Sequence, residues 1–241
     1  MRVHLDRMHA PRVETPRSEA ELLSRTRAFA GSTLAEVARL AGVALPIEPA
    51  RAKGFIGTLV ERALFISPKP GVAGPDLVEL GIEVKTIPLA KDGQPRESTF
   101  VCTIPLGRLE RESWETSAVR KKLARVLWVP IEHDRALPFA ARRLGAAFLW
   151  SPGAAEEATL RADWEAVQSL VLRGGVDGLD ARLGSALQVR PKARHGGMRV
   201  RAPGEDEVPT STMPRGFYLR ASFTATIVRA CCPGACPRGA V

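Results

Sequence analysis

The chain has 241 residues, of which 45% are hydrophobic and 25% charged, and it carries a formal net charge of +9 with a pI near 10.0. These proportions are ordinary for a globular protein with a real core. No apolar run approaches the ~20 residues that a membrane helix needs, and the first 30 residues lack the apolar centre of a secretion signal. We therefore expect a cytoplasmic protein whose basic surface attracts a polyanion such as DNA or RNA.

The positive charge is distributed unevenly along the chain. Residues 185–241 hold nine Arg and Lys residues against three acidic ones, and a second basic cluster lies at 120–125. A generally basic surface with solvated Arg side chains is the simpler explanation of such a charge. The clustering favours a face that binds nucleic acid.

The N-terminal part of the chain has the pattern of a short arm followed by helices. Residues 1–17 combine proline breaks with scattered charge, which predicts a disordered arm. Capping-box spacings predict helices over 18–30 and 33–42. A third helix is expected over 55–66, where apolar residues recur at helical spacing.

The remainder of the chain mixes strands with helices, which predicts an α/β layered fold. Asp92-Gly93 is a strong hairpin signal that would join a strand at 82–86 to one at 99–104. The further expected elements, in order, are a helix at 116–125, strands at 126–131 and 146–150, a helix at 155–172, a strand at 187–189, a mobile loop at 193–213, a strand at 216–219 and a last helix capped by Ser222.

Asp76, Glu83 and Lys85 form the most informative group in the sequence. Apolar and charged residues alternate from 82 to 86, so Glu83 and Lys85 point to the same side of a strand. Gly81 permits a tight bend before that strand, and Asp76 can then fold back beside Glu83. Two carboxylates and an ammonium at one point suit Mg²⁺-assisted phosphodiester hydrolysis.

A simpler interpretation of these three residues is a solvated strand face with a weak surface ion pair. Glu61 also has two interpretations. It lies on the helix at 55–66, either as a surface residue or as a carboxylate aimed at the same site as Asp76.

The cysteines do not predict a metal centre. Cys102 lies in an apolar run and is expected to be a buried small hydrophobe. Cys231, Cys232 and Cys236 crowd into one tight group without a histidine, whereas a zinc site usually needs four ligands in two spaced pairs. We expect residues 231–241 to be an atypical, loosely ordered tail rich in Cys, Pro and Gly.

A Pro-Asp pair followed by Glu-x-Lys on a strand resembles the catalytic motif of the restriction-endonuclease-like superfamily. The wider sequence resembles the MutH family of mismatch-repair endonucleases in order and spacing over about residues 18–230. The matching segments are 53–61, 80–88, 99–102, 114–117, 119–123, 125–128, 149–152, 190–193 and 214–219. The loop around 195–212 and the tail from Cys231 do not match.

This resemblance implies a fold and an activity. The fold would be a restriction-endonuclease-like mixed sheet flanked by helices, with two lobes around a DNA-binding cleft. The protein would be a monomer that needs Mg²⁺, or alternatively Mn²⁺. It would nick the unmethylated strand of double-stranded DNA at hemimethylated GATC sites, after activation by the mismatch-repair ATPase MutL.

The resemblance also implies roles for single residues. Asp76 and Glu83 would be the metal ligands, Glu61 a third catalytic carboxylate, and Lys85 and Lys122 the active-site lysines. The residues implied in DNA binding are Lys53 near the site, Phe100 on the facing loop, Arg190, Pro191 and Lys192 in the base-reading segment, and Tyr218 as the sensor of the adenine methyl group.

Physical arguments are compatible with the roles implied for DNA reading. An Arg fork can pair with guanine O6 and N7, which Lys cannot do as a rigid bidentate donor. The aromatic ring of Tyr218 could reject an added methyl group sterically, although a core tyrosine with a satisfied hydroxyl is the alternative.

Two other functions stay open at this point. A related GATC restriction endonuclease would cut both strands without MutL, but its relatives often carry a second lobe or act as dimers. A non-catalytic DNA-binding protein on the same scaffold would be expected to lack an acidic or Lys position of the motif, and none is missing here.

Overall fold

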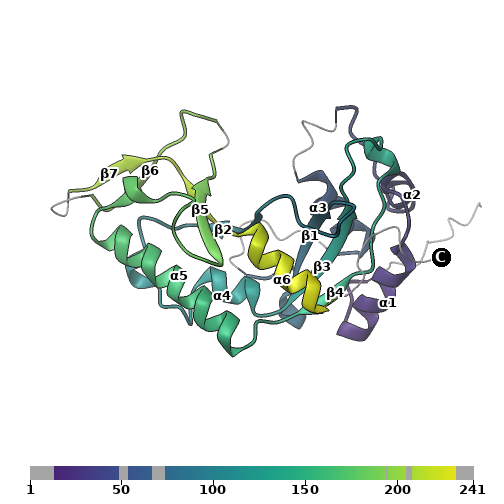
Figure 1. Cartoon of the computed structure of the whole chain (residues 1–241), viewed down its shortest axis with the longest axis horizontal. Coiled ribbons are helices and arrows are strands. Elements are labelled where there is room, and N and C mark those ends of the chain that lie inside the picture. The colour runs from purple at the N-terminus through teal and green to yellow at the C-terminus, as the bar shows by residue number, and fades with distance from the viewer. Residues whose placement is uncertain (1–13, 49–53, 67–73, 194, 205–207, 232–241) are drawn as a thin grey trace, which may run out of the picture.

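The computed structural model describes residues 14–48, 54–66, 74–193, 195–204 and 208–231. Within these ranges the chain forms a mixed α/β fold, elongated in the view of Figure 1. None of the helices described has the length and apolarity needed to span a bilayer. Three residues named above, Lys53, Cys232 and Cys236, lie outside the described ranges.

Three short helices follow the N-terminal arm: α1 (Glu19–Phe29), α2 (Leu34–Leu40) and α3 (Phe55–Ala63). Ser18 caps α1 and Thr33 with Glu36 forms a capping box at α2, as predicted. α3 ends earlier than the sequence predicts, because Phe65 adopts a left-handed φ of 59° that no helix can continue through. At the described end of the arm, Pro16 is buried.

The first sheet contains the strands β1 (Glu83–Leu89), β3 (Val126–Glu132) and β4 (Phe148–Trp150) in the order β1-β3-β4. β1 and β3 are parallel, whereas β3 and β4 are antiparallel, so the sheet is mixed as expected. The helix α4 (Ala118–Leu123) directly precedes β3 in the chain and lies against the second sheet.

Both faces of the first sheet are buried in hydrophobic cores. Val84 packs into the core formed with α1, α2 and α3. Ile87 and Leu89 pack into the larger core on the opposite side. Glu83 and Lys85 share the face of Ile87, so the predicted alternation is confirmed, but the simpler interpretation of a solvated face is wrong.

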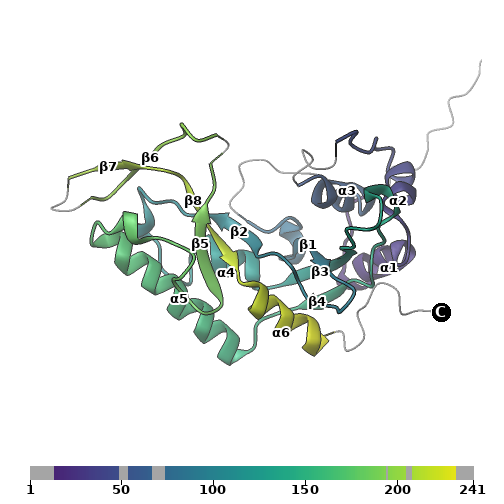
Figure 2. The same cartoon turned by 45° about the horizontal axis from the view of Figure 1, so that its top comes forward.

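The second sheet contains β2 (Thr99–Thr103), β5 (Leu187–Pro191) and β8 (Arg215–Leu219), all antiparallel, in the order β2-β8-β5. The long helix α5 (Ala154–Leu172) covers its inner side, and α6 (Ala221–Cys231) follows β8 directly. Figure 2 shows β2, β5 and β8 together between α5 and the first sheet. The four 3-10 turns described are η2 (Val78–Leu80), η3 (Leu109–Arg111), η4 (Phe139–Ala141) and η5 (Val176–Gly178).

The hairpin predicted at Asp92-Gly93 is wrong. A tight turn does form there, with Gly93 at a φ of 74°. The strands on its two sides nevertheless join different sheets, since β1 pairs with β3 and β2 pairs with β8. Only Leu89 and Pro95 form an isolated bridge across the turn. Pro95 has no backbone N–H, so it cannot extend a ladder.

Two expectations for the C-terminal third also need correction. The segment 193–213 is not only a loop, because its described part contains the short hairpin of β6 (Val200–Ala202) and β7 (Thr210–Thr212). Ser222 does not cap the last helix, because α6 already begins at Ala221.

A carboxylate and a guanidinium fix the turn that leads into β5. Asp163 of α5 is buried and accepts the backbone N–H groups of Ser185, Ala186 and Leu187 at distances of 2.7–3.0 Å. Arg220 donates to the carbonyls of Ala181, Leu183 and Gly184 on the same turn. The position of β5 therefore depends on these two side chains.

We predict that Asp163→Ala lowers the free energy of unfolding by about 3 kcal/mol, because three backbone N–H donors, two of them buried, lose a charged acceptor. Urea unfolding followed by circular dichroism measures the change. Asp177→Ala, on the exposed surface of η5, is the matched control and should leave the midpoint unchanged. Equal midpoints for Asp163→Ala and the unmodified protein would contradict the role given to Asp163.

Candidate active site

A reversal of the chain brings Asp76 beside β1. Leu77 and Ile82 form an antiparallel bridge, and between them lies the single turn η2, closed by Gly81 at a φ of 67°. Oδ2 of Asp76 then accepts the backbone N–H of Val84 at 2.9 Å. The bend at Gly81 and the return of Asp76 agree with the geometry expected from the sequence.

Glu83 lies at the centre of a buried ion-pair group. Its side chain is 2% exposed, and both of its carboxylate oxygens accept hydrogen bonds from Nζ of Lys122, at 2.9 and 2.8 Å. Nζ of Lys85 lies 2.5 Å from Oε1 of the same carboxylate. A buried carboxylate needs such partners, since an unpaired charge there would be costly.

Lys122 reaches Glu83 because of the way α4 is built. Ser117, which is buried, caps the helix by accepting the N–H of Arg120 and donates its own hydroxyl to the carbonyl of Trp114. Val119 and Leu123 bury one face of this short helix, and Lys122 follows Val119 by three residues, so it lies at the edge of that face. Lys122 in the last turn is left facing Glu83, 39 residues away in sequence.

Glu61 of α3 completes a group of carboxylates around this point. Burial raises the pKa of Glu61, and the negative charges of Asp76 and Glu83 raise it further, while Lys85 and Lys122 oppose them. Burial likewise raises the pKa of Asp76, with Glu83 as the second cause. Negative charge is therefore incompletely compensated here, and a cation would be favoured.

The donor set suits a hard divalent cation that is completed by substrate and water. Among the described residues, no three His, Cys, Asp or Glu side chains lie close enough together to form a ready-made metal site. Mg²⁺ typically uses one or two carboxylates together with phosphate oxygens and waters. Asp76 and Glu83 fit that pattern as oxygen donors.

Cys102 lies near the two lysines but is not a reactive thiol. It is buried in β2, and burial raises its pKa to about 12. The expectation of a small buried hydrophobe is confirmed. The charges of Lys122 and Lys85 oppose this rise in pKa, so Cys102 of β2 lies near the ion-pair group of Glu83.

The outer face of the second sheet gathers aromatic and basic side chains. Phe100 of β2 and Tyr218 of β8 are paired in register, with ring centroids 5.2 Å apart at 62°. The Arg190 guanidinium lies 5.8 Å from the Tyr218 ring, and Nζ of Lys192 lies 4.1 Å from the Phe100 ring. Pro191 ends β5 opposite Arg215. We call the surface formed by Phe100, Arg190, Lys192 and Tyr218 the aromatic–basic surface.

Tyr218 does not have the environment of a core tyrosine. It is half-buried, and its hydroxyl makes no hydrogen bond to any residue that the structure describes. Burial raises the pKa of this hydroxyl, so it stays protonated at neutral pH. A protonated hydroxyl on a half-buried side chain leaves the residue available to a ligand.

Two residues that support this surface were not identified from the sequence. Ser98 accepts a hydrogen bond from Arg190 at 2.7 Å and thereby orients the guanidinium. Gly216 lies under the rings, where a Cβ would be 2.9 Å from the Phe100 ring and 3.2 Å from Tyr218. Each stands two positions before an aromatic of the surface, so the period of a strand was the signal that could have identified them.

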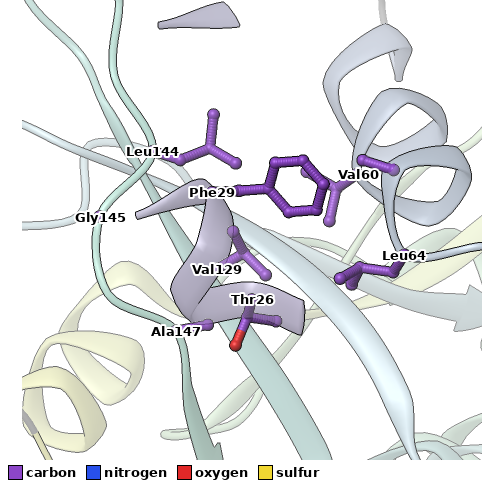
Figure 3. Close-up of a pocket in the computed structure, with 9 residues that line it drawn as sticks. Thr26, Phe29, Val60, Leu64, Val129, Leu144, Gly145 and Ala147 are labelled. Carbon is purple, nitrogen blue, oxygen red and sulfur yellow. The ribbon is translucent and has the colours of Figure 1, made fainter. Parts of the chain in front are cut away.

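A small apolar cavity elsewhere in the fold is not a substrate site. It has a volume of about 10 Å³ and lies between α1, α3 and the first sheet, lined among others by Phe29, Val60 and Leu144 (Figure 3). A cavity of that size holds at most one water. Thr26 supplies its only side-chain oxygen, and that hydroxyl donates to the carbonyl of Leu23. The cavity is a packing defect.

Buried carboxylates paired with lysines, together with a separate surface of aromatic and basic side chains, are typical of enzymes that act on nucleic acids. The sequence model described as DNA mismatch repair enzyme MutH matches residues 70–163, which include Asp76, Glu83, Lys85 and Lys122.

Full-length relatives extend this match to most of the chain. The DNA mismatch repair protein MutH of Pectobacterium atrosepticum is 45% identical over 225 residues, covering 92% of this chain and 96% of the relative. MutH of Yersinia enterocolitica is 46% identical over 215 residues (88% and 93%), and MutH of Vibrio parahaemolyticus is 45% identical over 213 residues (88% and 94%). The chain belongs to the MutH family.

We predict that Asp76→Asn stabilises the metal-free protein at neutral pH. The folded state raises the pKa of Asp76, so stability is present below the ordinary carboxyl pKa of about 3.9 and is lost as the pH rises through the raised value. The amide of the Asp76→Asn variant cannot ionise, so this loss of stability does not occur. Thermal unfolding in EDTA should show the variant melting higher at neutral pH, with the difference shrinking toward about pH 4. A variant that melts lower at neutral pH would contradict this electrostatic account.

Proposed function

We propose that this chain is a DNA mismatch-repair endonuclease that nicks the unmethylated strand at hemimethylated GATC sites in the presence of Mg²⁺ or Mn²⁺. The observation that carries the proposal is the buried Glu83 carboxylate, held by lysines from two separate elements beside Asp76. The names of the relatives support the repair role, because each is described as a DNA mismatch repair protein.

Asp76 and Glu83 would hold the metal ion. Once bound, that ion would polarise the scissile phosphate and acidify a water. The backbone N–H of Val84 fixes one oxygen of Asp76, which leaves Oδ1 for the metal. Glu61 lies close enough to Asp76 and Glu83 for their charges to raise its pKa, and it would orient the attacking water.

Lys85 and Lys122 would stabilise the negative charge that develops on the phosphate. Both ammonium groups are largely buried, with 15% and 17% of their side chains exposed. A preorganised charge in such a site acts more strongly than one in bulk water. Lys53 precedes α3 and would contribute a further positive charge near the DNA.

The aromatic–basic surface would read the site. Arg190, with Pro191 and Lys192, would enter the major groove, where the Arg fork can pair with guanine O6 and N7. Tyr218 would lie against the adenine edge and exclude a methyl group, and Phe100 would contact the facing strand. The protein would act as a monomer on double-stranded DNA under the control of MutL, within a two-lobed restriction-endonuclease-like fold.

We predict that Lys85→Ala and Lys122→Ala each lower the nicking rate of the bound complex by at least ~10²-fold, as expected for loss of transition-state charge stabilisation. Glu83→Gln should abolish nicking while DNA binding persists. Single-turnover nicking of a supercoiled plasmid separates the rate of cutting from binding.

Lys121→Ala is the matched control for Lys122→Ala. Its side chain is exposed on the same helix, so its loss should weaken binding to all DNA without changing the rate of the bound complex. If Lys122→Ala behaved like Lys121→Ala, Lys122 would be a phosphate anchor and not part of the catalytic group.

We also predict that Tyr218→Ser reduces discrimination between methylated and unmethylated strands, because the ring that would exclude the methyl group is gone. Tyr218→Phe keeps the ring and should keep most of the discrimination. Nicking rates on matched duplexes, measured at one salt concentration, give the comparison. Full discrimination by the Ser variant would show that methyl sensing lies elsewhere.

A further inference from the structure

One rung of the second sheet carries a side chain that neither the sequence nor the family resemblance singled out. Gln188 of β5 is paired in register with Tyr218 of β8, which is itself paired with Phe100 of β2. Residues that pair across antiparallel strands project to the same face, with Cβ atoms roughly 5 Å apart. Arg190, two positions along β5, projects to that face as well.

The opposite face of β5 is accounted for by the core. Leu187 and Val189 are buried and pack with Phe217 and Leu219 of β8. Gln188 lies between these two buried residues but is itself only half-buried. The strand therefore directs Gln188 to the outer face, together with the aromatic–basic surface, and not into the protein.

The side-chain amide of Gln188 has no hydrogen-bond partner among the residues that the structure describes. Arg190, two positions along β5, differs in this respect because it donates a hydrogen bond to Ser98. An amide has two donors and one acceptor, and a half-buried amide gains by pairing with a ligand. The rung thus holds an unused pair of hydrogen-bonding groups next to the Tyr218 ring.

We propose that Gln188 is a further specificity-determining residue, which pairs with the N6 and N7 edge of the adenine that Tyr218 probes. This inference rests on the proposed function at GATC sites. A glutamine amide can donate to N7 of adenine while its oxygen accepts an N6 hydrogen, and no other base offers that pair in the major groove. Gln188 would select the base, and Tyr218 would limit the space around it.

This pairing would also be sensitive to methylation. Adenine N6 carries two hydrogens, of which one bonds to thymine in the base pair and the other faces the major groove. In a paired N6-methyladenine the methyl group replaces the hydrogen that faces the groove. The Gln188 oxygen would then lose its donor and meet a methyl group, so the same contact would help to reject a methylated strand.

The test removes the hydrogen bond from each side separately. The probes are short duplexes with one GATC site, the same duplexes with 7-deazaadenine in the strand that is cut, and a random duplex. Dissociation constants are measured in EDTA at one salt concentration, so that no cleavage occurs. Gln188→Met keeps the length of the side chain without its amide, and Gln94→Met makes the same change in the turn after β1 as a control.

For the unmodified protein, 7-deazaadenine should weaken binding by about 10-fold, equivalent to about 1.4 kcal/mol. Gln188→Met should bind the GATC duplex about 10-fold more weakly, with little further penalty from 7-deazaadenine, and should bind random DNA as before. Gln94→Met should keep the full penalty.

Two results would overturn the inference, and they differ. If 7-deazaadenine costs the same in the unmodified protein and in Gln188→Met while GATC is still preferred to random DNA, Gln188 does not read the adenine. If the unmodified protein binds the GATC duplex and the random duplex equally, the proposed GATC specificity fails and the role of Gln188 fails with it.

Discussion

The ion-pair group around Glu83 connects the first sheet to helix α4. A carboxylate that is 2% exposed would be strongly destabilising without its partners, and those partners come from β1 itself and from α4. The group therefore fixes α4 against β1, and α4 in turn packs on β2 of the second sheet. Through α4, the group proposed to catalyse cleavage is thereby linked to the sheet that carries the surface proposed to read the DNA.

Stability and activity make opposite demands at this site. Burial raises the pKa values of Glu61 and Asp76, the charge of Asp76 raises that of Glu61 further, and the charge of Glu83 adds to both. A folded protein retains such a cluster only where other contacts compensate, as the cap of α4 and the Asp163 turn do here. A bound divalent cation would offset the repulsion among these carboxylates. Such a cluster of carboxyl groups with raised pKa values is typical of a catalytic site.

Local physics predicts some parts of the site from sequence and not others. The period of a strand and the glycine bend place Glu83, Lys85 and Asp76 correctly, since all three lie within one local segment. Lys122 could be assigned only by family resemblance, because its contact with Glu83 spans 39 residues. The predicted hairpin at Asp92-Gly93 is wrong because it too depends on contacts between residues far apart in the sequence. The turn chemistry was right, but long-range pairing with β3 and β8 decided the sheets.

If the Asp76 and Glu83 carboxylates drive strand-selective nicking, replacing Asp76 should abolish cutting without abolishing DNA binding. A hemimethylated GATC duplex with a different label on each strand is incubated with Mg²⁺ and either the unmodified protein or Asp76→Asn. We expect a single nick in the unmethylated strand by the unmodified protein and none by Asp76→Asn, which should still bind the duplex. Cleavage of both strands, or equal nicking by the two proteins, would contradict this expectation.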